Sequence, residues 1–401
     1  MILYGKDDNM CKIEINEKLR HLSNTQIEEL MELYYDGVKT SDLIEKYKID
    51  IIPSRLYTIF PQEVCKDELC PNCNVPLVKD RRSKSASKYN TNISYCLQCG
   101  HSNTPYCKCN ICEQARLKAK AIREYEEEME KAEKVKRINQ VYGIECEKRK
   151  VDSLSFRERV YLGALLRCAL SEDMSTILPL DKIDKSLAPS SELNFEILRY
   201  LKDNNIIRVD PNSSISAFVD DEDTEFPYTY YIYKVNYLIN IDFNEDYKEG
   251  ISKIINPKEL KECDKEEALK IWQEISLEES LEYLQYQMEN VKFNFNVGDK
   301  TKSVFKDMLE SFSVSQIYGI IFKSVANATK YYQESSVSKK QAANSVIGGC
   351  QRLSEKAKIN NWDMVKYSRI KELPQSEISE FFFDRVVGIG SLGFNMPPSE
   401  L

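Results

Sequence analysis

Two cysteine pairs with the same spacing, Cys70-Pro-Asn-Cys73 and Cys96-Leu-Gln-Cys99, decide how the cysteine-rich part of this sequence folds. They are separated by 22 residues, and eight of the 13 cysteines of the chain fall between residues 65 and 112. Disulfides belong mainly to exported chains, and the start of this sequence lacks the apolar stretch of a signal peptide. Because each C-x-x-C turn can direct two thiolates at one ion, the pattern predicts a structural metal site.

The paired turns are similar to those of zinc ribbons, in which four thiolates hold one Zn²⁺ in a closed tetrahedron. We therefore expect a zinc ion bound by Cys70, Cys73, Cys96 and Cys99. Gly100 follows Cys99 directly and supplies the backbone freedom that such a turn commonly uses.

A second set of ligands follows at once. Cys107, Cys109 and Cys112 lie within six residues and need a fourth partner to close a tetrahedral site. Either His101 or Cys65 completes the set, and the sequence leaves both choices open. The spacing favours a second structural zinc ion. A catalytic ion is disfavoured, because no further histidine or carboxylate cluster surrounds the cysteines to activate water.

The loop between the two C-x-x-C turns is basic and lies near two tyrosines, Tyr89 and Tyr95. Cations neutralise phosphates and tyrosines stack on bases, so this loop is a candidate nucleic-acid contact. A solvated surface loop or a protein-docking element remains an equal alternative. Its basic residues are Lys79, Arg81, Arg82, Lys84 and Lys88, against the single acid Asp80.

Residues 23–61 carry the signals of three short helices. Residues 23–26, Ser-Asn-Thr-Gln, form a capping-box start, Gly37 ends the first helix and Pro53 opens the third. The first helix repeats apolar residues at the spacing of one buried face, at Ile27, Leu30, Met31 and Tyr34.

This layout resembles the trihelical helix-turn-helix of resolvases and transposases, whose last helix enters the major groove of DNA. The resemblance covers residues 23–61 and implies two groups of contacts. It puts Ser54, Arg55, Tyr57 and Thr58 at the groove, and Lys39, Lys46 and Lys48 at phosphates. The first helix is acidic, however, so a helix-turn-helix that serves as a partner-binding or structural unit is the alternative.

The rest of the chain divides into three parts. Residues 113–152 are dense in charges with a narrow apolar seam, which predicts a long helix serving as a strut, or a coiled-coil homodimer. Residues 153–256 follow the order of a winged helix, with a Tyr-rich returning strand at 228–241. Five acids between Asp220 and Glu225 at the wing tip favour a protein partner there. After Pro257 the periodicity is helical to the end and predicts helices at residues 266–275, 277–291, 303–312, 315–332, 338–357 and 377–387.

A chain of 401 residues exceeds what one hydrophobic core usually supports, so several domains are expected. The predicted fold class is mainly α and multidomain. The expected domains are an N-terminal segment with the helix-turn-helix (1–62), a zinc-ribbon-like module (63–112), a charged helical linker (113–152), a winged-helix-like α+β module (153–256) and a C-terminal helical bundle (257–401).

The net charge of −8 is unevenly distributed along the chain. Residues 61–112 carry seven basic and four acidic residues, whereas residues 153–300 carry 17 basic and 29 acidic ones. Nucleic-acid contact is therefore expected to be local, and protein contact is expected through residues 153–401. No apolar run approaches the roughly 20 residues of a membrane span, so we expect a cytoplasmic protein without membrane contact.

Catalysis is not expected from this sequence. There are only two histidines, and one of them is a candidate metal ligand. Gly388, Gly390 and Gly393 match a dinucleotide fingerprint but lack its strand and helix context. The group of Asp242, Glu245 and Lys248 matches the spacing of restriction-type nucleases poorly.

The sequence thus predicts a non-enzymatic, zinc-stabilised protein that binds DNA or RNA, with DNA favoured, and that recruits or regulates through its later domains. The alternative is a non-enzymatic adaptor or scaffold in a bacterial multiprotein complex of the mobile-element or phage-defence type. In that case the zinc module contacts protein. A composition rich in Lys, Ile and Asn favours an AT-rich bacterial source.

Overall fold

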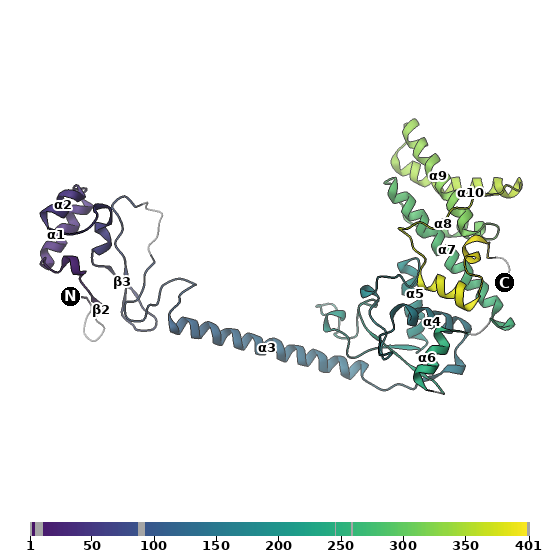
Figure 1. The fold of residues 1–401 in the computed structure, drawn as a ribbon, viewed down its shortest axis with the longest axis horizontal. Helices are drawn as coiled ribbons and strands as arrows, with labels where there is room; N and C mark the ends of the chain where they lie inside the picture. Colours follow the sequence, from purple (N-terminus) through teal and green to yellow (C-terminus); the bar gives the residue numbers. More distant parts are fainter. Residues whose placement is uncertain (1, 5–10, 87–92, 245, 258–259, 399–401) are drawn as a thin grey trace. The chain divides into compact units, whose positions relative to one another are not determined.

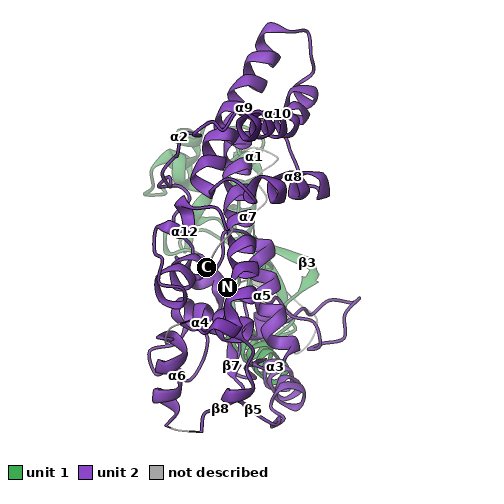
Figure 2. Cartoon of the chain, turned by 90° about the vertical axis from the view of Figure 1, so that its right-hand side faces the viewer, with its two compact units in different colours: residues 1–130 green, residues 131–401 purple. Residues whose placement is uncertain are grey.

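The computed structural model describes residues 2–4, 11–86, 93–244, 246–257 and 260–398. The chain is mainly helical, with short two-stranded sheets, and divides into unit 1 (residues 1–130) and unit 2 (residues 131–401) (Figures 1 and 2). Within the described residues, no helix is both long enough and apolar enough to cross a membrane.

Unit 1 begins with the antiparallel strands β1 (Ile2–Tyr4) and β2 (Cys11–Ile13), followed by the short 3-10 helix η1 (Glu17–Leu19). Two α-helices follow, α1 (Asn24–Tyr35) and α2 (Thr40–Lys46). The predicted capping box starts α1: the backbone N–H of Gln26 donates to Ser23 Oγ (3.3 Å), and the N–H of Ser23 donates to Gln26 Oε1 (2.9 Å).

The last of the three helices predicted in residues 23–61 is a 3-10 helix, η2 (Pro53–Ile59), rather than an α-helix. Its buried residues, Leu56 and Ile59, are three positions apart, which suits the three-residue turn of a 3-10 helix. All three segments close over one small apolar core, which includes Leu19, Ile27, Leu30, Tyr34, Leu43, Leu56 and Phe60.

The cysteine-rich segment contains the antiparallel strands β3 (Glu63–Leu69) and β4 (Pro76–Lys79). Tyr95 bridges Val78 of β4 on one side and Ser102 on the other, so four stretches of chain lie side by side. The long helix α3 (Asn110–Tyr142) follows, as the charge pattern predicted. Its first residues belong to unit 1 and those from Lys131 onward to unit 2.

Unit 2 has two hydrophobic cores, and the first gathers around α4 (Phe156–Ala169) and α5 (Ser191–Asp203). Two small sheets flank these helices, one parallel and one antiparallel. The parallel pair is β5 (Arg149–Lys150) with β8 (Ile241–Asp242), and the antiparallel pair is β6 (Ile207–Val209) with β7 (Tyr237–Ile239). Short 3-10 turns η3 (Val151–Ser153), η4 (Leu180–Lys182) and η5 (Ile215–Ala217) and the helix α6 (Tyr247–Ile255) complete this region.

The long returning strand predicted over residues 228–241 is wrong for most of its length, because only β7 and the first residue of β8 are strand. A turn interrupts the run, since the N–H groups of Lys234 and Val235 both donate to the carbonyl of Tyr231. Tyr230 packs edge-on against Tyr142 of α3. Tyr230 and Tyr233 are therefore packed in a loop and Tyr237 is buried, whereas Tyr228 and Tyr231 are exposed.

The second core of unit 2 is a helical layer. The predicted helices at 266–275 and 277–291 are one continuous helix, α7 (Lys265–Asn290), preceded by η6 (Glu262–Asp264). It packs with α8 (Asp299–Leu309), α9 (Val314–Glu334) and α10 (Lys339–Ile359), which lie close to their predicted positions.

The C-terminal segment returns to the first core of unit 2. The helix predicted at 377–387 is one turn of α-helix, α11 (Glu377–Glu380), continued by a π-helix, η7 (Phe381–Val386), and α12 (Leu392–Asn395) follows. Phe381, Phe382 and Phe383 are buried against α4 and α7. The indole N–H of Trp272 donates to the carbonyl of Gly393 (3.0 Å), which ties α7 to this returning segment.

The contact between α4 and η7 makes a testable prediction. A Cβ atom at Gly163 of α4 would overlap the ring of Phe381, which is almost fully buried. Gly163→Ala should therefore destabilise unit 2 by about 1–3 kcal/mol and lower its thermal unfolding temperature in calorimetry. Gly298→Ala is the control, because a Cβ there meets no atom within 4 Å. Equal unfolding temperatures for the two variants would contradict this packing.

Candidate metal centre

The two C-x-x-C segments fold into the same turn. The N–H of Asn74 donates to the carbonyl of Cys70 (2.9 Å), and the N–H of Gly100 donates to the carbonyl of Cys96 in the same way (2.9 Å). Asn74 and Gly100 both have a left-handed backbone, with φ of 54° and 71°. Gly100 therefore supplies the left-handed backbone expected after Cys99. Asn74 does the same after Cys73, because asparagine tolerates this conformation.

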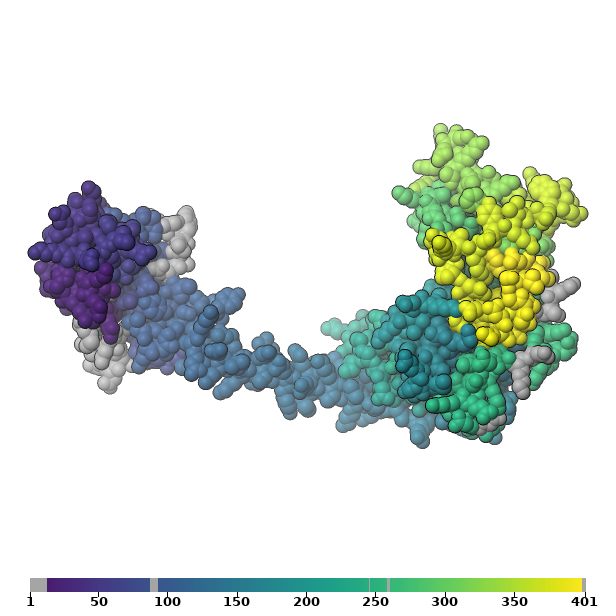
Figure 3. Space-filling model, viewed as in Figure 1, coloured from purple at the N-terminus to yellow at the C-terminus, as the bar shows by residue number. Residues whose placement is uncertain are grey.

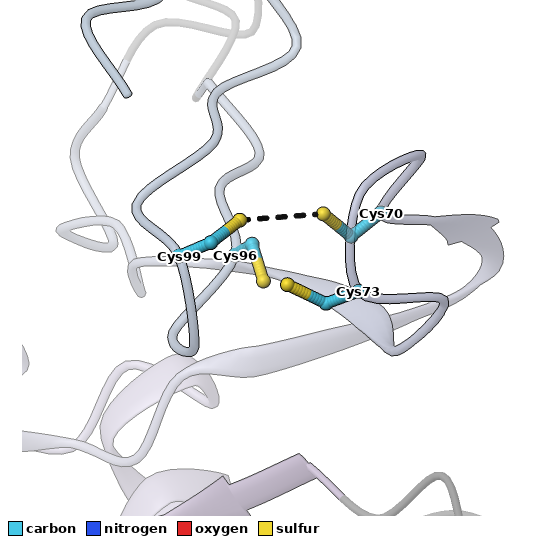
Figure 4. Close-up of side chains that lie close together, drawn as sticks. All are labelled: Cys70, Cys73, Cys96 and Cys99. Atoms are coloured by element: carbon cyan, nitrogen blue, oxygen red, sulfur yellow. Dashed lines mark hydrogen bonds between the residues drawn. The ribbon is translucent and has the colours of Figure 1, made fainter. Parts of the chain in front are cut away.

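The first ligand set consists of Cys70, Cys73, Cys96 and Cys99, whose sulfur atoms all lie within 4.8 Å of one another (Figure 4). The sulfurs of Cys70 and Cys99 are 3.6 Å apart. This separation is too long for a disulfide, and all four thiols are free. A tetrahedral ion with metal–sulfur bonds of about 2.3 Å holds its sulfurs about 3.8 Å apart, so the spacing fits a tetrahedral ion.

The second set consists of His101, Cys107, Cys109 and Cys112. The Nδ1 atom of His101 lies 3.5, 3.8 and 3.3 Å from the sulfurs of these three cysteines in turn. A tetrahedral ion would separate nitrogen from sulfur by about 3.6 Å. His101 is thus the fourth member of this set, and Cys65, the alternative that the sequence left open, belongs to neither set.

Asn72 joins the two ligand sets, and sequence reasoning missed it. Its side-chain amide donates weakly to Cys99 Sγ of the first set (3.9 Å) and to Cys109 Sγ of the second (3.7 Å). Hydrogen bonds to ligand sulfurs orient the ligands and balance their charge. The sequence signal that could have indicated this role is the asparagine at the third position of the first C-x-x-C turn, because its amide can reach sulfurs of both ligand sets.

Protons are shared unevenly among the thiols of the first set. Burial raises the pKa of Cys99, but the backbone N–H of His101 and the neighbouring thiols lower it further, to about 7. Cys73 is affected in the opposite direction: its hydrogen bond to Cys99, burial and the nearby Cys96 raise its pKa to about 12. Cys99 therefore loses its proton more readily than Cys73, and a cation bound by the four sulfurs would favour the thiolate form of all of them.

The second set has the same imbalance. Backbone N–H groups of Ser102 and Cys109 donate to Cys107 and lower its pKa to about 6. The hydrogen bond that the Cys112 thiol donates to Cys109, together with burial, raises the pKa of Cys112 to about 11. The carbonyl of Cys107 also accepts a hydrogen bond from Arg116 of α3 (2.6 Å), which fixes the start of that helix against the second set.

Most cations of the predicted basic loop have partners inside unit 1. Lys79 pairs with Glu68 (2.9 Å). Arg81 donates to the carbonyl of Pro61 (3.3 Å) and lies 3.8 Å from Glu63. Lys84 donates to the carbonyl of Val38 (2.7 Å) and lies over the ring of Tyr34.

These contacts attach the loop to the helical part of unit 1. The hydroxyl of Tyr35 donates to the carbonyl of Arg82 (2.8 Å), and the N–H of Lys84 donates to the hydroxyl of Tyr34 (3.3 Å). Among the described residues, no hydrogen bond or ion pair engages the Arg82 side chain. Tyr95 is half-buried and donates to Asp80, while Lys88 and Tyr89 lie outside the described residues.

The candidate groove residues on η2 lie at the surface. Ser54, Arg55 and Thr58 are exposed and Tyr57 is half-buried. Lys46 pairs with Glu29 (3.1 Å). In the part of unit 1 that the structure describes, the side chains of Lys39, Lys48 and Arg55 make no hydrogen bond or ion pair and are exposed.

Comparison with known proteins adds no assignment: no protein-family model, curated protein or solved structure matched this chain significantly.

The geometry predicts two metal ions per chain. Cys99→Ser should reduce the content to one ion by removing a ligand from the first set, and Cys112→Ser should do so through the second set. Native mass spectrometry with elemental analysis measures both. Cys65→Ser is the control and should retain two ions. Loss of an ion from that variant would contradict the ligand sets.

A second prediction concerns Asn72. Asn72→Ala removes the amide between the two sets and should speed metal release to a competing chelator roughly tenfold, the lower end of the usual effect of such outer contacts. Gln98 is the matched control, because it occupies the same position of the other C-x-x-C turn and is exposed. Release rates that are equal in Asn72→Ala and Gln98→Ala would show that Asn72 does not support the ligands.

Proposed function

We propose that this chain is a non-enzymatic, zinc-stabilised protein whose unit 1 binds nucleic acid, with DNA favoured over RNA. Unit 2 contacts protein partners in a recruiting or regulatory role. The observation that carries the proposal is a set of exposed cations on the segment of α2 and η2 that have no partner among the described residues, namely Lys39, Lys48 and Arg55. Such cations are free to neutralise phosphates or to reach base edges.

Zinc is the ion that suits both ligand sets. Four thiolates, or three thiolates and one imidazole, in tetrahedral spacing are the usual structural zinc sites. The ligands of both sets are largely buried, and neither set leaves an open position for water. We therefore assign a structural rather than a catalytic role to the ions, in a zinc-ribbon-like module.

The arrangement of the helical segments in unit 1 supports the proposal of a helix-turn-helix. α1, α2 and η2 close over one core, and η2 presents Ser54, Arg55 and Thr58 outward. Arg55 is the residue able to make a bidentate contact to guanine. Lys79, Arg81 and Lys84 of the basic loop engage their donors inside unit 1, so the proposal relies on Lys39, Lys48 and Arg55 in preference to the loop.

An adaptor role without nucleic acid is the second candidate, and the charges of unit 2 favour it. The acidic stretch that begins at Asp220 is exposed for much of its length, and Lys134 of α3 pairs with Asp220 (2.7 Å). This surface repels phosphate and suits a basic protein partner. Under this alternative the zinc module serves only to hold an interaction surface.

A binding experiment separates the two candidates. The full chain should bind duplex DNA with an affinity that falls steeply as salt rises, because phosphate contacts release counterions. Replacing Lys39, Lys48 and Arg55 by alanine should weaken binding and reduce the slope of log affinity against log salt by about 0.9 for each phosphate that is no longer neutralised. Fluorescence anisotropy across a salt titration measures both quantities.

The control replaces three exposed lysines of unit 2, Lys300, Lys323 and Lys371, by alanine, which changes the net charge by the same amount. It should leave the affinity and the salt slope unchanged. Absence of salt-sensitive binding to DNA and to RNA by the zinc-loaded chain would reject nucleic-acid binding and leave the adaptor role.

A further inference from the structure

The part of α3 that belongs to unit 1 exposes an apolar stripe. Ile111, Ile122, Tyr125 and Met129 have exposed fractions of 50, 58, 64 and 54%, and Ala115 and Ala119 lie exposed between them. These six residues recur every three or four positions, so they follow one face of the helix. Figure 3 draws this segment with its side chains, in blue. We call this set the α3 stripe.

The charges beside the α3 stripe form two blocks of opposite sign. Residues 116–123 contain four cations and no acid, and residues 124–130 contain five acids and no cation. The cations are Arg116, Lys118, Lys120 and Arg123, and the acids are Glu124, Glu126, Glu127, Glu128 and Glu130. The change of sign falls between residues 123 and 124, near the middle of the stripe.

We propose that the α3 stripe binds the same stripe of a second copy of this chain, in antiparallel orientation, about a two-fold axis near residues 123 and 124. In that orientation the basic block of each copy faces the acidic block of the other. A parallel pair would instead place basic against basic and acidic against acidic. Charges beside an apolar seam set partner choice and orientation in paired helices, so the block pattern selects the antiparallel pair.

The apolar residues suit the same axis. An antiparallel pair centred there puts Ile122 of one copy opposite Tyr125 of the second copy. It also brings Ala119 close to Met129 of the second copy, which matches a small side chain with a long one. Two-fold symmetry repeats each contact, and one surface patch on each copy is sufficient for the interface.

This stripe also explains a feature of α3 that the fold leaves unexplained. A helix gains most of its stability in proteins from packing an apolar face, but none of residues 111–130 is buried, and Cys112 of the second ligand set is half-buried. Pairing with a second copy supplies the missing contact. The proposal is independent of nucleic-acid binding, since it uses no residue of α2 or η2.

Sedimentation equilibrium of the zinc-loaded full chain tests the proposal. The wild type should associate to a dimer with rising concentration, and Ile122→Glu with Met129→Glu should raise the dimer dissociation constant at least about tenfold. Leu117→Glu is the matched control: Leu117 is 61% exposed but lies off the stripe, so the dimer should persist. Circular dichroism checks that the variants keep their helix content, since glutamate is a good helix former.

Orientation is tested by mixing ¹⁴N- and ¹⁵N-labelled protein and coupling amines to carboxylates with a carbodiimide. Mixed-isotope peptides should join Lys118, which lies on the same side of α3 as the stripe, to acids of the 124–130 block of the other copy. A monomer at every accessible concentration, a dimer that survives the stripe substitutions, or a dimer without these mixed-isotope peptides would each overturn the proposal.

Discussion

Residues 63–112 contain two ligand sets, each with its side chains close enough to hold a metal ion, and the proposed function of unit 1 depends on ions binding there. Apart from its cysteines, the small core around the first set contains only Val75 and Leu77 as buried side chains. Such a core is too small to fix four thiols within 4.8 Å of one another, and thiolates at that distance repel each other. A divalent ion reverses this repulsion, so the metal-binding free energy becomes folding free energy.

Contacts join the cysteine-rich segment to the rest of unit 1. The loop after β4 leaves the first ligand set and packs on α1 through the hydroxyls of Tyr34 and Tyr35. On the other side, Arg116 ties the start of α3 to the carbonyl of Cys107. The helical segments and the cysteine segment therefore form one unit, and the exposed cations of α2 and η2 are held relative to the metal sites.

The sequence was enough to predict the first ligand set, because C-x-x-C spacing alone brings two sulfurs close together. The choice between His101 and Cys65 as fourth member of the second set could be made only from the structure. His101 was separable from Cys65 only once the second turn placed it beside Cys107. Periodicity located most helices of unit 2, but it missed α6 and divided α7 into two helices. The long strand predicted at residues 228–241 was wrong for most of its length. Strand propensity does not account for the turn at residues 231–235 or for the ring contacts of Tyr230. Charge counts also do not reveal that Lys79 and Lys84 have partners inside unit 1, and nucleic-acid contact by the basic loop stays a prediction.

The measurement that tests the central claim most directly is nucleic-acid binding by one preparation of the full chain before chelation, after chelation and after zinc is restored. Duplex affinity at low salt should be lost with the metal and return with zinc, together with the folded signal of unit 1 in circular dichroism. Binding that is unchanged in the metal-free chain, or absent from the zinc-loaded chain, would contradict a metal-organised nucleic-acid surface.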